Sequence, residues 1–210
     1  KLVRSVPKNN KNVKNTEKHW HLKGNWAPVE KELEVQNLEV IGNIPKEISG
    51  KYIRNGMNPV SGYSDRWFFG NGMLHCVEIE NGVASYKNKY VRTPYFENDM
   101  SMMEGSFDLK ASPANTHVIR HADKILTLEE AHFPWIVDDN LETVGSHDFK
   151  GKLNGPMTAH PRICPETNEL LFFGYQMMKK PYLTYHRVSA DGELIQSEEI
   201  DIPRPVMMHD

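Results

Sequence analysis

The sequence predicts an all-β fold, and three observations support this prediction. Short extended runs rich in β-branched and aromatic side chains recur from Leu38 onward. Clusters of Asn, Asp, Gly and Pro separate these runs at regular intervals and predict tight turns. No long window shows the apolar stripe of an amphipathic helix. A sandwich, a barrel and a propeller all fit this pattern, and spacing alone does not choose among them.

Individual strands and turns can be assigned in chain order. Asn81-Gly82 separates the runs Met73–Ile79 and Val83–Val91, and this dipeptide is the strongest short-range signal for a β-hairpin. Later turns are expected at 122–123, 138–140, 165–168 and 191–192. The strands expected around them are Thr116–Arg120, Ile125–Leu128, Trp135–Val137, Leu170–Tyr175, Leu183–Val188 and Leu194–Ile202.

Composition excludes several classes of protein. The chain has 210 residues, 39% hydrophobic and 25% charged, which suffices for one domain with a substantial core. Its net charge of −3 gives no electrostatic basis for nucleic-acid binding. No apolar stretch reaches the length of a membrane-spanning helix, and no signal-peptide core is visible. The two cysteines, Cys76 and Cys164, fit a reducing compartment, so a cytoplasmic location is expected.

Residues 1–18 differ from the rest of the chain in composition. They carry six Lys or Arg among asparagines and few large apolar groups, so a flexible basic tail is expected. A plain solubilising extension is favoured over a peripheral contact with anionic lipid at a membrane. Residues 19–210 are expected to form the folded part. The start at Lys1 rather than Met suggests that the sequence is a fragment.

Two histidines give the clearest indication of function. His160 follows the run Met157–Ala159 and precedes Pro161, which biases it toward extended backbone. His209 lies in the run Val206–Asp210. Neutral imidazole is the commonest side-chain ligand of redox transition metals. Two such residues at the ends of different strands therefore suggest half of a metal site.

A series of short segments spans residues 19–210 and forms recognisable motifs. Gly50–Pro59 resembles G-x-Y-x-R-N-G-P-N-P, and Gly24–Val29 resembles G-N-F-A-P-V. The other segments of the series are Phe69–His75, Tyr90–Thr93, Ala114–Ile119, Lys124–Glu130, Leu141–Gly145, 158–161 and 207–210. Together they resemble the motifs of the carotenoid cleavage oxygenase family in the family's own order. Each motif is weak by itself, whereas the ordered series is highly specific.

The resemblance implies a seven-bladed β-propeller with a non-haem Fe(II) on its axis, held by four histidines. At about 45 residues per blade, this chain supplies three to four of the seven blades. By the motif match, His160 and His209 correspond to the first and second iron ligands. Glu130 corresponds to a glutamate that fixes the tautomer of a ligand histidine. The third and fourth ligands are expected beyond Asp210.

Some positions depart from the family pattern. Phe69 and Asn71 replace two acidic residues of F-D-G-D-G-M, and Met57 replaces the proline of R-N-G-P-N-P. Glu129 stands where the stilbene-cleaving branch has a lysine that holds the substrate phenol. Because a carboxylate does not stabilise a phenolate, Glu129 disfavours a phenolic substrate and favours an apolar polyene.

The function expected from these features is that of an Fe(II)-dependent dioxygenase. It would cleave a conjugated C=C bond of a carotenoid or apocarotenoid with O2, giving two carbonyl products and requiring no general acid or base. The chain alone is expected to be inactive, since it carries only two ligands. A lignostilbene-type stilbene dioxygenase and a non-catalytic propeller that acts as a binding module are the alternatives. A calcium-dependent hydrolase lacks a supporting motif, and the oligomeric state is open.

The remaining histidines and methionines receive structural interpretations. His75 and His117 lie in strand motifs and are expected to be hydrogen-bonded rather than ligands. The methionines line an apolar tunnel or pack in the core, and both interpretations stay open; those concerned include Met102, Met103, Met177 and Met178. The histidines in polar or turn contexts are expected to be exposed: His19, His21, His132, His147 and His186.

Overall fold

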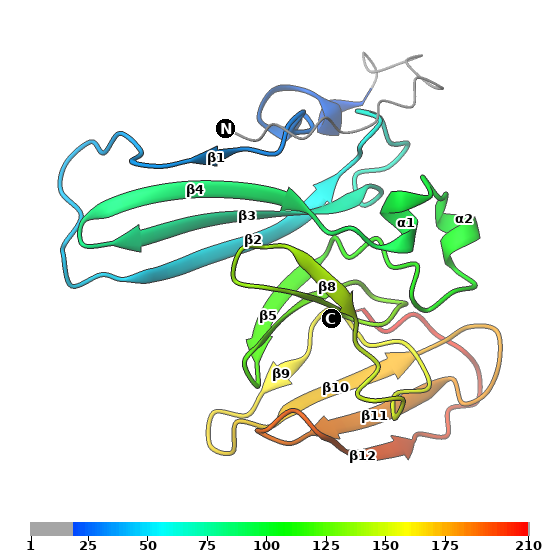
Figure 1. Cartoon of the computed structure of the whole chain (residues 1–210). Helices are drawn as coiled ribbons and strands as arrows, with labels where there is room; N and C mark the ends of the chain where they lie inside the picture. The colour runs from blue at the N-terminus through cyan, green and yellow to red at the C-terminus, as the bar shows by residue number, and fades with distance from the viewer. Residues whose placement is uncertain (1–18, 210) are drawn as a thin grey trace. The chain divides into compact units, whose positions relative to one another are not determined.

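The computed structural model describes residues 19–209, which divide into two compact units after Tyr90. Three four-stranded antiparallel sheets make up most of the regular secondary structure (Figure 1). The helices found among the described residues are single turns, so the all-β prediction is confirmed. None of these helices is long and apolar enough to cross a membrane. The expected basic tail, residues 1–18, lies outside the described residues.

The first unit is built on one sheet with the strand order β1-β4-β3-β2. Asn81 and Gly82 have φ values of 52° and 81° and form the predicted hairpin turn between β3 and β4. Two motif segments meet in this unit, because the Asn58 side chain accepts a hydrogen bond from Val29 N–H at 2.6 Å and donates to Val29 O at 2.9 Å. The elements are η1 (Trp20–Leu22), η2 (Gly24–Trp26), β1 (Glu34–Val35), β2 (Gly50–Asn58), β3 (Asn71–Glu80) and β4 (Val83–Tyr90).

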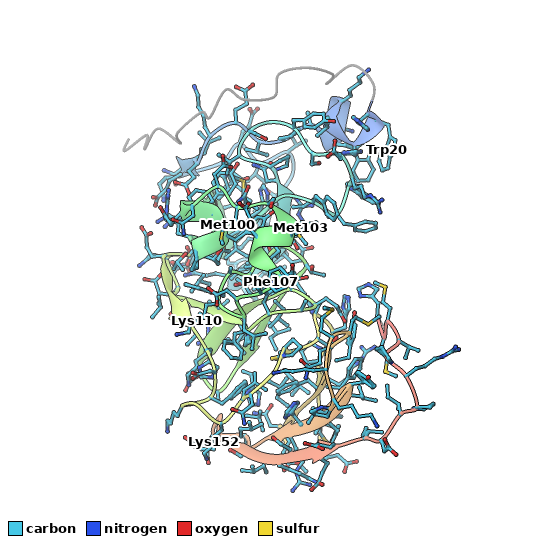
Figure 2. All side chains as sticks on the ribbon, turned by 90° about the vertical axis from the view of Figure 1, so that its right-hand side faces the viewer. Trp20, Met100, Met103, Phe107, Lys110 and Lys152 are labelled. Carbon is cyan, nitrogen blue, oxygen red and sulfur yellow. The ribbon has the colours of Figure 1, made fainter. Side chains whose placement is uncertain are left out.

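The second unit begins with two short helices. Thr93 caps α1 (Pro94–Glu97) through a hydrogen bond from Phe96 N–H. Ser101 and Glu104 form a reciprocal capping box on α2 (Met102–Gly105). Near α2, the side chains of Met103 and Phe107 are 76% and 83% exposed (Figure 2). Met177 and Met178 are also exposed, so of the four methionines only Met102 has a side chain that is partly covered.

Two sheets complete the second unit, with strand orders β5-β6-β7-β8 and β12-β11-β10-β9. All four predicted turns connect strands that pair as antiparallel neighbours. The strands of the first sheet are β5 (His117–His121), β6 (Lys124–Leu128), β7 (Trp135–Val137) and β8 (Thr143–Ser146). Those of the second sheet are β9 (Arg162–Ile163), β10 (Leu170–Tyr175), β11 (Leu183–Val188) and β12 (Leu194–Glu199).

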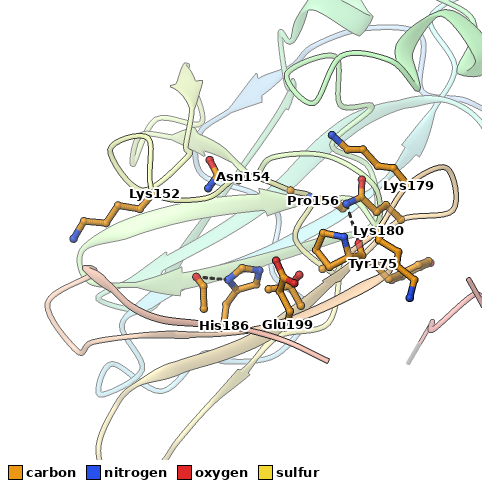
Figure 3. Close-up of a pocket in the computed structure, with 14 residues that line it drawn as sticks. Lys152, Asn154, Pro156, Tyr175, Lys179, Lys180, His186 and Glu199 are labelled. Carbon is orange, nitrogen blue, oxygen red and sulfur yellow. Dashed lines mark hydrogen bonds between the residues drawn. The ribbon is translucent and has the colours of Figure 1, made fainter. Parts of the chain in front are cut away.

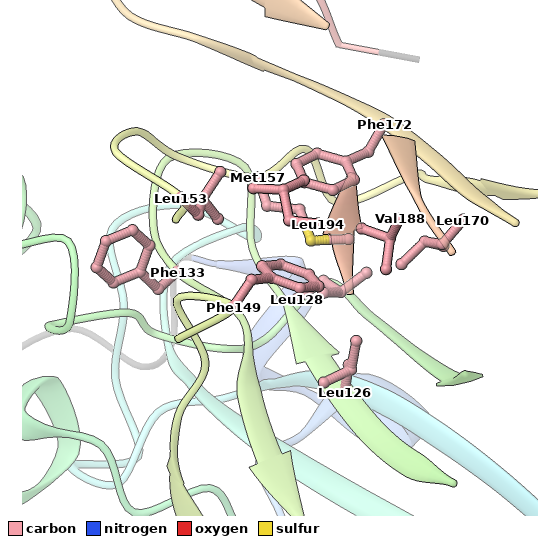
Figure 4. Packing of buried hydrophobic residues seen from close by; sticks show 10 residues of the cluster. All are labelled: Leu126, Leu128, Phe133, Phe149, Leu153, Met157, Leu170, Phe172, Val188 and Leu194. Atoms are coloured by element: carbon pink, nitrogen blue, oxygen red, sulfur yellow. The ribbon is translucent and has the colours of Figure 1, made fainter. Parts of the chain in front are cut away.

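The two sheets of this unit share a hydrophobic core. β6 contributes Leu126 and Leu128, and the second sheet contributes Leu170, Phe172 and Val188 (Figure 4). Along β10, the buried residues Leu170 and Phe172 alternate with less buried ones, as expected for a strand with one face in the core. The core therefore fixes the loop that follows β6 relative to β10, and both of these contribute to the candidate site.

Candidate metal centre

Glu130 lies in the loop directly after β6, and its side chain is 14% exposed. The carboxylate accepts hydrogen bonds from Thr158 Oγ1 at 3.2 Å and from Ala159 N–H at 3.3 Å. It also accepts a bond from His209 Nδ1 at 3.1 Å. One carboxylate thus connects two segments that are far apart in the sequence.

Residues 156–160 are held against β10 by their backbone. Thr158 N–H donates to Phe173 O at 2.9 Å, and Met157 N–H donates to His132 O at 3.1 Å. The absence of a side chain at Gly174 permits this packing, because a Cβ there would lie 2.1 Å from Pro156 O. These contacts fix the backbone immediately before His160.

His160 and His209 approach each other as the sequence predicts. Their ring centroids are 4.9 Å apart, with the planes at 72°. The ring of His160 also contacts the ring of His117, and the two ring centroids are 5.6 Å apart. The Nδ1 atom of His117 bonds Ala159 O at 2.8 Å, so the expected hydrogen bond of this histidine is present. His75 likewise bonds Tyr86 Oη through Nδ1 at 2.7 Å.

The donor set fits a first-row transition metal. Glu130, His160 and His209 each offer one ligand atom, and these atoms all lie within 4.8 Å of one another. Because Glu130 accepts a hydrogen bond from the Nδ1–H group of His209, the Nε2 atom of His209 keeps a lone pair for a metal. Imidazole nitrogens are ligands that suit iron, copper and zinc alike. The three residues predicted from sequence are therefore brought together.

Glu129 points toward a buried histidine. Its carboxylate accepts the Ala131 N–H at 3.0 Å and bonds His132 Nδ1, while His132 Nε2 donates to Gly105 O at 3.1 Å. Burial lowers the pKa of His132, but the hydrogen bond and charge of Glu129 and the Gly105 carbonyl outweigh it, so the pKa is raised. The expectation that His132 is exposed is wrong, since it is 4% exposed.

Tyr175, the last residue of β10, was not predicted as part of the site. Burial raises the pKa of its phenol, and the negative charges of Glu130 and Glu129 and a hydrogen bond with Glu130 raise it further. The signal available in the sequence was an aromatic residue at the end of a predicted strand, next to a turn. That signal is too common to single out one tyrosine.

Two more of the histidines that were expected to be exposed are buried. His21 contacts Ser64 O at 3.2 Å, and His186 bonds Ser197 Oγ at 2.9 Å. His19 and His147 are partly buried. The error has a physical reason: these imidazoles find hydrogen-bond partners across strands and loops, which a polar sequence context does not reveal.

Comparison with known proteins identifies the family. Residues 26–210 match the family described as retinal pigment epithelial membrane protein. The chain belongs to the carotenoid cleavage oxygenase family. It is 34% identical to carotenoid 9,10(9',10')-cleavage dioxygenase 1 of Arabidopsis thaliana, covering 90% of this chain and 42% of that protein. The resemblance deduced from the motifs is confirmed.

Other relatives of this chain are named for different substrates. A carotenoid cleavage oxygenase of Mycobacterium tuberculosis is 35% identical, over 90% of this chain and 40% of its own length. Resveratrol cleavage oxygenase 1 of Aspergillus fumigatus is 34% identical, over 89% of this chain and 41% of its own. The chain thus spans about two fifths of the length of these curated relatives.

Solved structures confirm the predicted fold class. The lignostilbene dioxygenase of Pseudomonas brassicacearum superposes with a TM-score of 0.79 at 28% identity, over 92% of this chain and 45% of that one. A variant of the Synechocystis apocarotenoid oxygenase gives a TM-score of 0.76 at 24% identity, over 87% and 45% of the two chains. These relatives are propeller enzymes, and this chain carries part of the same all-β fold.

Proposed function

We propose that this chain supplies two imidazole ligands and one orienting carboxylate to the Fe(II) site of a dioxygenase that cleaves a conjugated C=C bond. The observation that carries the proposal is the convergence of His160, His209 and Glu130 from three separate segments. Membership in an oxygenase family whose named members cleave carotenoids or stilbenes supports it.

The role of each residue follows from its contacts. Bound Fe(II) would supply the activation of dioxygen, while the chain supplies ligand geometry. Glu130 accepts a hydrogen bond from the Nδ1–H group of His209 and so orients the ring, which makes Nε2 the ligand atom. Thr158 and Ala159 donate to the same carboxylate and fix its position. With these bonds, Glu130 acts as an orienting group for the ligand rather than as a proton carrier.

The substrate that we propose is an apolar polyene, a carotenoid or apocarotenoid. Glu129 is engaged with His132 and Ala131, and its negative charge is unsuited to a substrate phenolate. Cleavage of a hydroxystilbene is the second candidate, because relatives that act on resveratrol and lignostilbene match this chain well. Assaying both substrate classes with the Glu129→Lys variant separates them. Stilbene cleavage that appears only in the variant supports the polyene, and equal stilbene turnover by the unaltered protein contradicts it.

Paramagnetic NMR of the chain titrated with Fe(II) under anaerobic conditions tests the metal site. Fe(II) should selectively broaden the imidazole signals of His160 and His209, and should leave those of His19 and His147 sharp. The His160→Ala and His209→Ala variants should each remove the effect. Uniform broadening of all histidines, or none, would favour a non-catalytic propeller that serves as a binding module.

The isolated chain is proposed to bind Fe(II) weakly and to be inactive. Two imidazoles provide half of the four-histidine ligand set that the family resemblance implies. Oxygen consumption by the purified chain with a polyene substrate measures this directly. Turnover with stoichiometric iron would contradict the proposal and would show that two protein ligands suffice.

A further inference from the structure

A pocket of 310 Å³ lies in the second unit (Figure 3). Glu130, His160 and His209 do not line it, whereas Tyr175, which contacts Glu130, does. Its walls come from the ends of β10, β11 and β12, from residues 152–156 and from the turn after Tyr175. Gly174, with Pro156 packed on it, forms the floor between these segments. The volume is at the lower end of the range for ligand cavities, which indicates a compact ligand.

The pocket contains a buried polar group with a free nitrogen. His186 is 4% exposed and stacks on Phe172, with ring centroids 4.7 Å apart. Its Nδ1 bonds Ser197 Oγ, whereas Nε2 has no hydrogen-bond partner among residues 19–209. Nε2 is not among the buried side-chain atoms that lack a partner, so this nitrogen is accessible from the pocket and can contact a ligand there. Burial lowers the pKa of His186 to about 4, and the ring is therefore neutral at pH 7.

The charge of the pocket wall is positive. Lys152, Lys179 and Lys180 line it, against one acidic residue, Glu199. Lys152 and Lys180 form exposed ion pairs at 3.4 and 3.5 Å with Glu193 and Asp201. Lys179 has no carboxylate within ion-pair distance in the described part of the chain. The ammonium group of Lys179 can therefore bind an anion without breaking an existing ion pair.

We propose that this pocket binds a compact phosphate group, held by Lys179 and by the free Nε2 of His186. Lysine is a common point-charge ligand for phosphate. Glu199 selects the ligand further, because it pairs with Thr184 in register and faces the same pocket. Near neutral pH phosphate keeps an O–H group, which can donate a hydrogen bond to the Glu199 carboxylate. Sulfate has no O–H group to donate. The pocket therefore distinguishes phosphate from sulfate, two anions of the same shape.

Phosphate binding is measured by calorimetric titration of the full chain with inorganic phosphate at constant ionic strength. Lys179→Gln should weaken binding about tenfold or more, as expected for the loss of one charge-assisted hydrogen bond. Lys110→Gln removes another exposed lysine outside the pocket and should change nothing. Sulfate should bind more weakly than phosphate, and Glu199→Gln should reduce this difference. The ¹⁵N shift of His186 Nε2 should move as phosphate binds.

A second experiment tests whether the phosphate group belongs to a lipid headgroup or to a free ligand. Cosedimentation with phosphatidylcholine vesicles, with and without phosphatidic acid, detects a lipid headgroup. Lys179-dependent binding to the phosphatidic-acid vesicles alone supports the proposal and assigns the phosphate to a lipid. Saturable binding of inorganic phosphate supports it and assigns a free ligand. Absence of both, or equal effects of Lys179→Gln and Lys110→Gln, overturns it.

Discussion

The Nδ1 atom of His209 lies 3.1 Å from Oε2 of Glu130, although 79 residues separate the two in the chain. This contact orders the last described segment onto the loop after β6. It also determines which nitrogen of His209 carries the lone pair, because the carboxylate accepts a hydrogen bond from Nδ1–H and leaves Nε2 unprotonated. The geometry of the metal site is therefore set by a residue that need not touch the metal.

Substituting Glu130→Gln tests this relationship. The amide keeps the shape of the side chain but loses its charge, so the preferred tautomer of His209 is held less firmly. We expect Fe(II) affinity to fall about 10- to 100-fold, the usual effect of losing an outer-sphere partner. Titration with Fe(II) measures this. The matched control Glu166→Gln, in an exposed turn, should leave affinity unchanged; similar losses in both would contradict the orienting role.

Gly174→Ala tests the close packing behind His160. A methyl group there would lie 2.1 Å from Pro156 O, which is backbone and cannot rotate away. We expect the free energy of unfolding to decrease by about 3 kcal/mol, near the upper end for overpacking. Urea denaturation measures this. Gly145→Ala in β8 is the matched control, because nothing lies within 4 Å of its added Cβ, and it should be tolerated.

His132→Phe tests the buried pair with Glu129. The substitution leaves a nearly buried carboxylate without its partner and the Gly105 carbonyl without its donor. We expect the free energy of unfolding to decrease by about 3 kcal/mol. The double variant Glu129→Gln/His132→Phe should recover part of this loss, since no unpaired charge remains. A double variant less stable than the single one would show that the pair does not act through charge.

The predictions made from sequence succeeded where the signal is local. Turns such as Asn81-Gly82 require positive φ values that few residues adopt, so composition alone locates them. Alternating burial along β10 follows from the period of a strand. The ordered motifs singled out His160, His209 and Glu130 because each motif carries its own spacing, and the fold brings the three side chains together.

The predictions failed where burial depends on a distant partner. His132 and His186 lie in polar sequence contexts, yet a carboxylate, a carbonyl and a hydroxyl supplied by other segments allow both to be buried. Tyr175 joins the site through a carboxylate 45 residues away in the chain, counted from Glu130. Tertiary packing decides these contacts, and no local pattern encodes them.

The acid sensitivity of the fold provides a last test, through His186. Burial lowers the pKa of this imidazole to about 4, below the value of about 6.5 expected in the unfolded chain. Between these two values the unfolded state binds more protons than the folded state. Stability therefore falls as pH decreases from about 6.5 to 4, by roughly 3 kcal/mol for this one group.

His186→Phe should remove this contribution and keep the stacking on Phe172. Urea denaturation of both proteins from pH 7 to pH 4 measures it, with the comparison made on the slope of stability against pH. Other titrating groups, including His75 with its own lowered pKa, remain in both proteins and cancel in the difference. Ser197→Ala keeps the imidazole and should retain the full slope. Parallel curves for His186→Phe and the unaltered protein would mean that His186 takes up its proton in the folded state, and that the ring is less enclosed than its 4% exposure indicates.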